Sequence, residues 1–330
     1  YEVFEDMDAA LAYLETAPVP TVIKADGLAL GKGVILAQNE DEAVAAVHEM
    51  IDELKFGKSS ARIVVEEFLT GPEVSVLSFT DGKTVVPMIS SMDHKRALDG
   101  DEGLNTGGMG TVAPNPYYTD DVAKQCMETI FKPTIEAMNA EGRTFEGCLY
   151  FGLMLTPKGP KVIEYNCRFG DPETQVVLPM LDADLCEIFE AIYDHKLADV
   201  DIKWKSGSCT CVVMASGGYP LSYPKGLEIS GLNEMGQVDG AFVYHAGTKL
   251  ADGKFLTNGG RVLGVTCTAL TLAEALKKSY AAVEKISWEN VHYRHDIGQR
   301  ALKADVDPLD LDYKDDMEDY IESNGVYLRQ

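Results

Sequence analysis

Apolar residues recur with a strand-like period in several short segments of the first ninety residues. β-branched and aromatic residues dominate these segments and turn-forming residues separate them, so each is predicted to be a strand. The segments lie at residues 21–24, 34–36, 62–69, 74–79 and 85–89. The last two flank Asp81 and Gly82, a dipeptide typical of a tight hairpin turn.

Helical spacing of apolar residues is clearest in two segments that each open with a capping signal. Asn39 is followed three residues later by Glu42, and Thr271 is followed in the same way by Glu274. This is the capping-box arrangement, which satisfies backbone donors in the first helical turn. Further helices are expected at 1–15 with no strand before it, at 120–140 with an interruption at Pro133, and around 185–192.

The segment from 90 to 118 shows neither period. It is rich in Gly, Asp, Asn and Pro, and it is predicted to be a long loop. Loops longer than about 12–15 residues within a compact domain are usually functional or disordered. Beyond it, residues 148–156 and 161–167 are expected to pair as a hairpin around a turn at 157–160.

Composition narrows the class of protein. The chain has 330 residues, of which 45% are hydrophobic and 25% charged, as in a globular protein of two or three domains. A formal net charge of −24 argues against nucleic acid or an anionic membrane as a partner. No apolar stretch reaches the ~18–20 residues of a membrane span. Seven cysteines without a Cys-x-x-Cys pair predict reduced, buried thiols and a cytoplasmic location.

The first candidate for chemistry is a glycine-rich turn between the first two strands. It holds Gly27, Gly31 and Gly33 together with Lys24 and Lys32. The glycine spacing is one residue too short for a Walker A loop, and no Ser or Thr follows the second lysine. Backbone N–H groups and two ammonium groups in so short a segment suit a polyphosphate. A tight β-turn with solvated lysines is the alternative.

Two further segments are polar. Residues 66–73 are typical of an edge strand with charged ends, but their position after a lysine-bearing strand and a helix suits an adenine-binding hinge. Residues 93–96 (Asp-His-Lys-Arg) precede a glycine-rich loop at 105–110. Those glycines allow close backbone approach to an anion. Because several nearby glycines lower the stability of a loop, a functional role for them is favoured over a plain surface loop.

The strongest candidate is the segment from 163 to 173. Alternate residues of a strand share a face, so Glu164, Asn166 and Arg168 are expected to point the same way. The opposite face is expected to point into the core; it is formed by Ile163, Tyr165 and Cys167. A carboxylate beside an amide oxygen suits Mg²⁺. The arginine, with Asp171 and Glu173 nearby, suits a transferring phosphoryl group.

These motifs, in this order, resemble the ATP-grasp superfamily and, within it, the phosphoribosylamine–glycine ligases, also called glycinamide ribonucleotide synthetases. The similarity rests on residues 22–34, 66–73, 93–96, 105–110, 162–175, 245–249 and 257–262. It implies an α+β ATP-grasp fold, with two α+β subdomains sandwiching ATP, and then a small β-rich C-terminal domain. The expected parts are a nucleotide lid at 1–71, a catalytic and metal-binding subdomain at 72–205, the C-terminal domain at 206–300 and an acidic tail at 301–330.

The resemblance also implies an activity in purine biosynthesis. In that family ATP activates glycine as glycyl phosphate, the amine of 5-phosphoribosylamine attacks it, and glycinamide ribonucleotide, ADP and phosphate are released. Mg²⁺ or Mn²⁺ is the expected cofactor. The family begins with a further N-terminal domain that is absent here, so the chain is expected to be a fragment whose partner is that domain. Another ATP-grasp carboxylate–amine ligase and an ATP-binding module without turnover are the alternatives.

Carried over residue by residue, the resemblance assigns roles to the segments above. The residues expected to bind ATP are Lys24, Gly31, Lys32, Gly33, Glu66, Glu67, Phe68, Leu69 and Glu73. Those expected to hold the other substrates are Asp93, His94, Asn105, Thr106, Gly107 and Gly108. The expected catalytic residues are Lys95, Arg168 and Asp171, and the expected metal ligands are Glu164 and Asn166.

Overall fold

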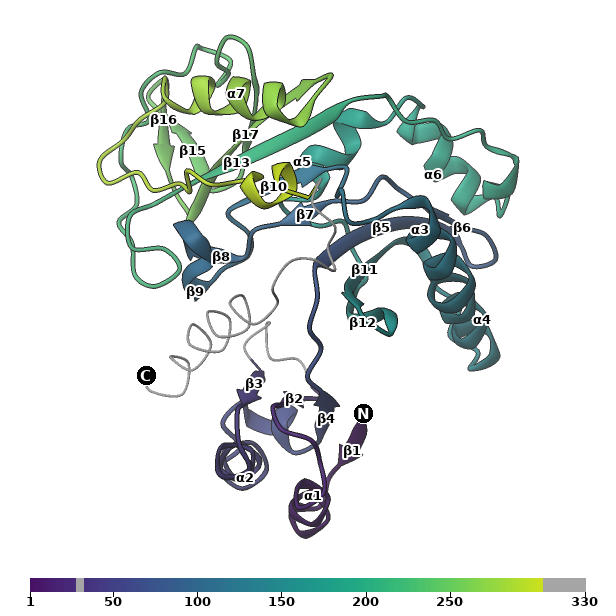
Figure 1. Cartoon of the computed structure of the whole chain (residues 1–330). Coiled ribbons are helices and arrows are strands. Elements are labelled where there is room, and N and C mark those ends of the chain that lie inside the picture. Colours follow the sequence, from purple (N-terminus) through teal and green to yellow (C-terminus); the bar gives the residue numbers. More distant parts are fainter. Residues whose placement is uncertain (28–32, 305–330) are drawn as a thin grey trace. The chain divides into compact units, whose positions relative to one another are not determined.

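Figure 1 shows the computed structural model, which describes residues 1–27 and 33–304. It consists of two compact units, one formed by residues 1–70 and the other beginning at Gly71. Each unit has hydrophobic cores of its own. Gly31 and Lys32, both expected to bind ATP, lie outside the described residues, as does the acidic tail beyond Ala304.

The first unit is a four-stranded antiparallel sheet with two helices. In the order β1-β4-β2-β3, the strands are β1 (Glu2–Phe4), β4 (Ile63–Glu67), β2 (Thr21–Ala25) and β3 (Val34–Ala37). The helices are α1 (Met7–Leu14) and α2 (Glu40–Val47), and short helical turns follow at His48–Asp52 and Gly57–Ser60. Apolar side chains of the sheet and helices form one core, which includes Ala10, Ile23, Val47 and Ile63.

The elements predicted for this unit are confirmed, with one addition. Asn39 caps α2, and its side chain accepts the N–H of Glu42 at 3.0 Å, as the capping box predicts. The strand β1 is not predicted by the sequence, because three residues are too few to show a period. It is held instead by pairing with β4, where Val3 lies opposite Val64. The helix predicted over 1–15 therefore begins only at Met7.

The second unit contains two main sheets, both antiparallel. The first has the order β12-β11-β5-β6, with β5 (Glu73–Asp81), β6 (Val85–Pro87), β11 (Glu146–Thr156) and β12 (Gly159–Asn166). One face carries α3 (Asp120–Cys126) and α4 (Lys132–Ala140), and the other carries α5 (Thr174–Val177) and α6 (Leu185–Tyr193). Short helical turns lie at Met127–Phe131, Leu178–Met180 and Leu197–Asp199. The turn at Met127–Phe131 is π-helical and precedes Pro133, which confirms the predicted interruption.

The second sheet has the order β14-β17-β13-β10-β7. Three of its strands come from the C-terminal part of the chain: β13 (Ser208–Ala215), β14 (Phe242–His245) and β17 (Arg261–Ala269). A separate two-stranded sheet is formed by β15 (Thr248–Ala251) and β16 (Lys254–Thr257). The helix α7 (Leu272–Val283) packs on β13 and β17, and α8 (Gln299–Leu302) follows. Thr271 caps α7 and accepts the N–H of Glu274 at 3.3 Å, as predicted.

The prediction of a structureless loop at 90–118 is wrong. The segment contains β7 (Met92–Asp93), β8 (Arg96–Leu98), a helical turn (Asp99–Asp101), β9 (Glu102–Asn105) and β10 (Gly110–Ala113). These strands are too short to show a period. β8 and β9 pair with each other, β7 pairs with β10, and β10 is held by the distant strand β13. Because β10 pairs with β13, the second sheet takes strands from both sides of the boundary expected at 205. The four-part division of the chain stays a prediction.

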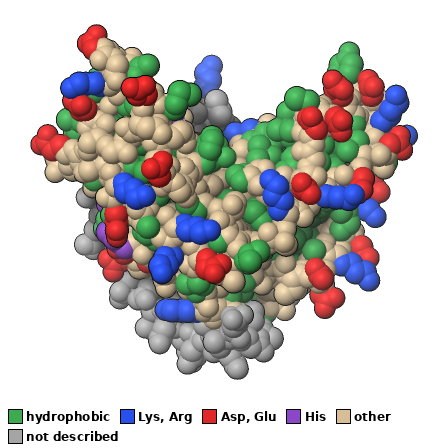
Figure 2. Space-filling view, turned by 90° about the horizontal axis from the view of Figure 1, so that it is seen from above, with side chains coloured by type: hydrophobic (Ala, Val, Ile, Leu, Met, Phe, Trp, Pro, Cys, Tyr) green, Lys and Arg blue, Asp and Glu red, His purple; other side chains and the backbone are tan. Residues whose placement is uncertain are grey.

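The thiols agree with the prediction in part. All seven cysteines are free and five are buried, but Cys167 and Cys186 are exposed, so the prediction of buried thiols is wrong for these two. Among the described residues no helix is both long enough and apolar enough to cross a membrane. Acidic and basic side chains are interspersed on the face shown in Figure 2.

Buried charge ties the β8–β9 hairpin to the segment before α8. The side chain of Arg294 is 1% exposed, and its guanidinium contacts Asp101 at 2.7 Å and Asp296 at 2.7 Å. Its Nη1 also donates to the carbonyl of Arg96 at 3.2 Å. Removal of this buried cation would leave Asp296 without its ion-pair partner and would take one donor from the carbonyl of Arg96, whereas Asp101 would keep its ion pair with Arg300.

We expect Arg294→Met to lower the free energy of unfolding by about 3–5 kcal/mol, because Asp296 loses its cation and the carbonyl of Arg96 loses a buried donor. Urea unfolding followed by tryptophan fluorescence measures this, since Trp204 and Trp288 both lie in the second unit. Lys254→Met is the matched control: it breaks an exposed pair with Glu228, which is worth about 0–1 kcal/mol. Equal shifts for the two variants would contradict the structural role of Arg294.

His94 is buried and neutral by geometry. Its Nδ1 contacts the carbonyl of Gly110 at 3.0 Å, and its Nε2 accepts the N–H of Gly298 at 3.1 Å. A proton on Nε2 would oppose that N–H. Burial, and then the charge of Arg294, lower the pKa of His94 to about 4.

This arrangement predicts acid destabilisation. Above the unfolded-state pKa of about 6.5, His94 is neutral in both the folded and the unfolded protein. Between about pH 6.5 and 4, His94 binds a proton in the unfolded chain but stays neutral in the folded protein. Stability attributable to His94 therefore falls as pH drops through this window, by up to about 1.4 kcal/mol per pH unit. Urea unfolding at pH 7, 6, 5 and 4 should show this slope in the parent protein and its loss in His94→Asn. Parallel curves for the two would refute it.

Candidate functional site

The end of β12 brings the predicted metal ligands together. Glu164 lies opposite Gly152 and Asn166 lies opposite Tyr150 on β11. The amide of Asn166 donates to Glu164 Oε1 at 3.3 Å, and Arg168 Nη2 approaches Asn166 Oδ1 at 3.5 Å. The three side chains thus form a continuous polar row, as the strand alternation predicts. All three retain hydrogen-bonding capacity for a ligand.

The opposite face of this strand differs from the prediction. Tyr165 is 47% exposed and Cys167 is also exposed. The register of β12 slips beside Gly152, so that Ile163 is an additional residue in a bulge. β12 is an edge strand that ends at Asn166, so Cys167 lies beyond it. The ring of Tyr165 still contacts Phe151, with centroids 5.5 Å apart, but does not enter the core.

An ion pair lies at the start of β5. Lys95 Nζ is 2.6 Å from Glu73 Oε2, and both side chains are partly exposed. Burial opposes ionisation of Glu73, but attraction to Lys95 outweighs it and lowers the pKa of Glu73. The carboxylate of Glu73 raises the pKa of Lys95. Lys95 is therefore a fixed cation, and Glu73, which is expected to bind ATP, is its counter-ion.

Two acids lie close to this pair, the buried Glu173 and the partly buried Asp93. Glu173 is 5% exposed and its Oε1 accepts the hydroxyl of Tyr150 at 3.1 Å. That hydroxyl also lies 2.8 Å from Ser75 Oγ. Burial raises the pKa of Asp93 well above its usual range, and the charge of Glu173 raises it further. Burial raises the pKa of Glu173 as well.

The glycine loop packs directly on these acids. A Cβ at Gly108, where φ is +111°, would lie 2.4 Å from Pro172 Cδ and 2.6 Å from Asp93 Oδ1, so only glycine fits. The hydroxyl of Thr106 donates to the carbonyl of Lys95 and accepts the N–H of Gly108. The loop is therefore bound to the 93–95 segment on one side and to Pro172 on the other.

The backbone donors of this loop are already used. The N–H of Gly107 donates to Tyr219 Oη at 3.1 Å, and the N–H of Met109 donates to the carbonyl of His94 at 2.8 Å. With the Gly108 N–H bound to Thr106, none of these three donors remains for an anion. Asn105 is an exposed residue of β9, opposite Arg96 in the hairpin. His94 uses both ring nitrogens within the fold.

The remaining ATP candidates lie in the first unit. Lys24 on β2 and Glu66 on β4 form an ion pair of 2.7 Å. The carbonyl of Gly33 accepts the N–H of Ala25 at 2.8 Å and closes the β2–β3 hairpin. The expected hinge residues continue from the end of β4; they are Glu67, Phe68 and Leu69.

Sequence reasoning assigned no role to several residues that shape the site. Tyr150 and Ser75 are buried strand residues, and nothing in their local sequence distinguishes them from core positions. Tyr219 and Arg261 lie more than a hundred residues along the chain from Gly107, which both contact. Arg261 lies in the segment 257–262, one of those on which the family resemblance rests, and this was the sequence signal that could have pointed to it.

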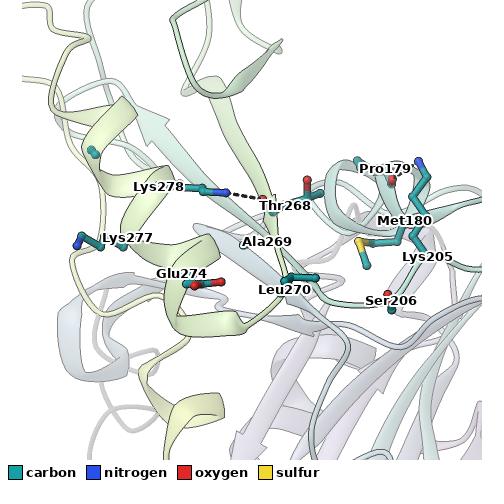
Figure 3. A pocket seen from close by; sticks show the side chains of 11 residues that line it. Pro179, Met180, Lys205, Ser206, Thr268, Ala269, Leu270, Glu274, Lys277 and Lys278 are labelled. Carbon is teal, nitrogen blue, oxygen red and sulfur yellow. Dashed lines mark hydrogen bonds between the residues drawn. The ribbon is translucent and has the colours of Figure 1, made fainter.

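A cavity of about 730 Å³ lies elsewhere in the second unit (Figure 3). Pro179, Met180 and Lys205 line one side, and the end of β17 with Lys277 and Lys278 of α7 lines the other. Lys278 Nζ approaches the carbonyl of Thr268 at 3.5 Å. None of the candidate residues lines this cavity, so it is separate from the site.

Comparisons with known proteins agree with the expected family. Residues 1–174 match the ATP-grasp (A) domain of phosphoribosylglycinamide synthetase, and residues 209–300 match its C domain. The chain is 49% identical over 302 residues to a phosphoribosylamine–glycine ligase of Halalkalibacterium halodurans, covering 92% of this chain and 70% of that protein.

Solved structures give the same result for the fold. The crystal structure of phosphoribosylamine–glycine ligase from Thermotoga maritima superposes with a TM-score of 0.78 and 34% identity, covering 89% of this chain and 73% of that one. A biotin carboxylase domain of a Hydrogenobacter thermophilus 2-oxoglutarate carboxylase superposes with a TM-score of 0.63 at 15% identity over 88% of this chain and 62% of that one, which shows likeness of fold alone. The chain belongs to the phosphoribosylglycinamide synthetase family and has its ATP-grasp fold.

Proposed function

We propose that this chain serves the ATP-dependent ligation of glycine to 5-phosphoribosylamine, by way of glycyl phosphate. The observation that carries the proposal is the polar row of Glu164, Asn166 and Arg168 at the end of β12, in a member of a ligase family. The products would be glycinamide ribonucleotide, ADP and phosphate. The reaction would be a step of purine biosynthesis.

Glu164 and Asn166 fit a divalent metal that arrives with ATP. They offer neighbouring oxygen ligands, and a Cβ at Gly152 would lie 3.0 Å from Glu164 Cγ, so the glycine leaves room for this carboxylate. Within residues 1–27 and 33–304, no group of three His, Cys, Asp or Glu could hold a metal alone. Mg²⁺ commonly takes only one or two protein carboxylates and completes its shell with phosphate and water. Bound there, the ion would neutralise charge on the phosphate oxygens.

The cations of the site suit the phosphoryl step. A glycine carboxylate oxygen attacks the γ-phosphorus while ADP departs, and negative charge accumulates on the transferring group. Arg168 lies next to the proposed metal ligands and offers several donors. Lys95 remains charged because Glu73 raises its pKa. We assign Arg168 to the acyl phosphate and Lys95 to the substrate side of the site.

The buried acids suit the second step. When the amine nitrogen attacks the acyl carbon, phosphate leaves and the nitrogen must lose a proton. Asp93 and Glu173 have raised pKa values, and the charges of Lys95 and Arg168 both act on Glu173. A carboxylate of raised pKa is a stronger base than an ordinary one. We therefore assign to Asp93 and Glu173 the role of accepting the proton that the amine nitrogen loses.

The proposal is tested by a product assay on the full-length protein. ATP, glycine and phosphoribosylamine should give glycinamide ribonucleotide and ADP in equal amounts, and glycine with ATP alone should give little ADP. The chain spans 70% of the relative from Halalkalibacterium halodurans, so the assay uses the full-length protein. Turnover with a different acid or amine would identify another ATP-grasp ligase. Nucleotide binding without any ADP release would identify a binding module.

Glu164→Gln should weaken binding of Mg-ATP, because the variant loses the carboxylate charge that the metal requires, while the fold is retained. Calorimetric titration of Mg-ATP measures the loss. Glu187→Gln on α6 removes an exposed carboxylate elsewhere in the same unit and should bind as the parent does. Equal affinity of all three proteins would remove Glu164 from the metal site.

Arg168→Ala should lower turnover by about 10²–10³, the usual effect of removing a preorganised charge at a transferring group. The KM for ATP should change less, because the charge acts mainly after binding. Steady-state kinetics of the full-length protein provide the measurement. Arg143→Ala, at an exposed turn after α4, controls for the loss of an arginine. Near-normal turnover in Arg168→Ala would exclude Arg168 from the chemistry.

A further inference from the structure

One guanidinium joins the two loops that surround the buried acids. Arg261, the first residue of β17, has a side chain that is 20% exposed. Its Nη1 donates to the carbonyls of Gly107 and Asp171, both at 2.7 Å, and lies 3.4 Å from that of Gly108. Its Nη2 is 3.2 Å from the carboxylate of Asp171. The C-terminal sheet thereby holds the 105–110 loop and the 171–173 segment with a single side chain.

Gly107 is held from both sides of its peptide. The side chain of Arg261 binds its carbonyl, and the hydroxyl of Tyr219 accepts its N–H at 3.1 Å. A Cβ at Gly107 would lie 2.9 Å from Arg261 Cζ, so the guanidinium packs against the glycine itself. Tyr219 is fixed in turn by Gly260, where a Cβ would lie 2.2 Å from its ring. The position of the loop is therefore determined by two side chains of the C-terminal region.

Asp171 is held just as completely. Its Oδ1 accepts from Gln175 Nε2 at 2.7 Å, and its Oδ2 and main-chain carbonyl accept from Arg261. Both carboxylate oxygens have partners, so Asp171, expected to be catalytic, is better placed to fix the next two residues. These are Pro172, which packs against Gly108, and Glu173, which meets Asp93 electrostatically.

We propose that Arg261 is a positioning residue of the active site: by holding Gly107 and Asp171 together, it sets the separation of Asp93 and Glu173. The inference rests on the proposed function, because that function makes Asp93 and Glu173 the groups that accept a proton from the amine substrate. Arg261 has no contact with the polar row of Glu164, Asn166 and Arg168 among the hydrogen bonds of the described residues. Its effect should therefore fall on glycine and the amine and not on ATP.

The test is steady-state kinetics of Arg261→Met in the full-length protein, with glycine, phosphoribosylamine and ATP varied in turn. Misplacement of reacting groups by about 1 Å typically costs about 10²-fold, so we expect kcat/KM for glycine or the amine to fall by about 10- to 100-fold. The KM for ATP should be unchanged. Arg261→Lys should recover part of the loss, since an ammonium can still bind carbonyls but lacks the planar fork.

Tyr219→Phe supplies a second, independent arm. It removes the acceptor of the Gly107 N–H and keeps the ring, so it should lower the same kcat/KM values as Arg261→Met. Because both side chains act through Gly107, their effects in the double variant should be less than additive. Additive effects would show that the two do not act on one loop.

Val283→Ala is the control for general destabilisation. Val283 is fully buried in the core around α7 and lies in the same unit, so this variant should lose stability and keep every KM. Arg261→Met with unaltered kcat/KM for glycine and the amine, or with a raised KM for ATP, would overturn the inference. An inactive parent protein would instead overturn the proposed function, so the two failures are distinguishable.

Discussion

The second unit depends on how the chain crosses from its first sheet to its second. Ser91 forms two backbone hydrogen bonds with Ser75 on β5, of 2.9 and 3.0 Å. The next residue, Met92, already belongs to β7 in the other sheet. In the segment that follows, Met92 and Val112 enter a hydrophobic core, and polar contacts hold residues 93–96. Asp93 and Lys95 lie within it, and Glu73 lies at the start of β5. The candidate site occupies this junction because both sheets deliver side chains to it.

Charge at such a junction has to be matched locally, whatever the net charge of the chain. The protein carries a formal charge of −24, yet the buried cation Arg294 and the partly buried Lys95 each have acidic partners. Asp93 and Glu173 differ, because burial makes ionisation of both unfavourable and each adds to the cost for the other. Burial of two acids side by side lowers the stability of the folded protein, and packing alone gives no reason for it. Their raised pKa values are what an acid–base role requires.

Elements with a local signal could be predicted, and elements held by distant partners could not. The capped helices and the β11–β12 hairpin follow from residues within a few positions of each other. The strands β1, β7 and β10 are two to four residues long. They exist because β1 pairs with β4, β10 pairs with β13, and β7 pairs with β10. The alternation that aligned Glu164 with Asn166 also predicted a buried Tyr165. The bulge at Ile163 and the open edge of β12 prevent that, and neither has a signature in the sequence.

Motifs name the residues of a site without separating those that meet a ligand from those that hold the site in shape. Remaining hydrogen-bonding capacity makes that distinction. His94 has both ring nitrogens bound, Asp171 has both carboxylate oxygens bound, and Gly107 has its N–H and carbonyl bound. The ring nitrogens of His94 and the N–H of Gly107 have nothing left to offer a substrate, and the oxygens of Asp171 and Gly107 are already held in place by partners within the fold.

Arg168 and Lys95 keep donors in excess of their partners, and Glu164 keeps acceptors. A buried polar group that is fully bonded within the fold gains nothing further from a ligand, whereas one with spare capacity can exchange water for substrate. The same loop thus contains residues of both kinds, because fixing an acid or a cation in space requires neighbours that are themselves fixed. The C-terminal sheet supplies those neighbours through Tyr219 and Arg261, which gives this part of the chain a place in the chemistry without direct contact with the reacting atoms.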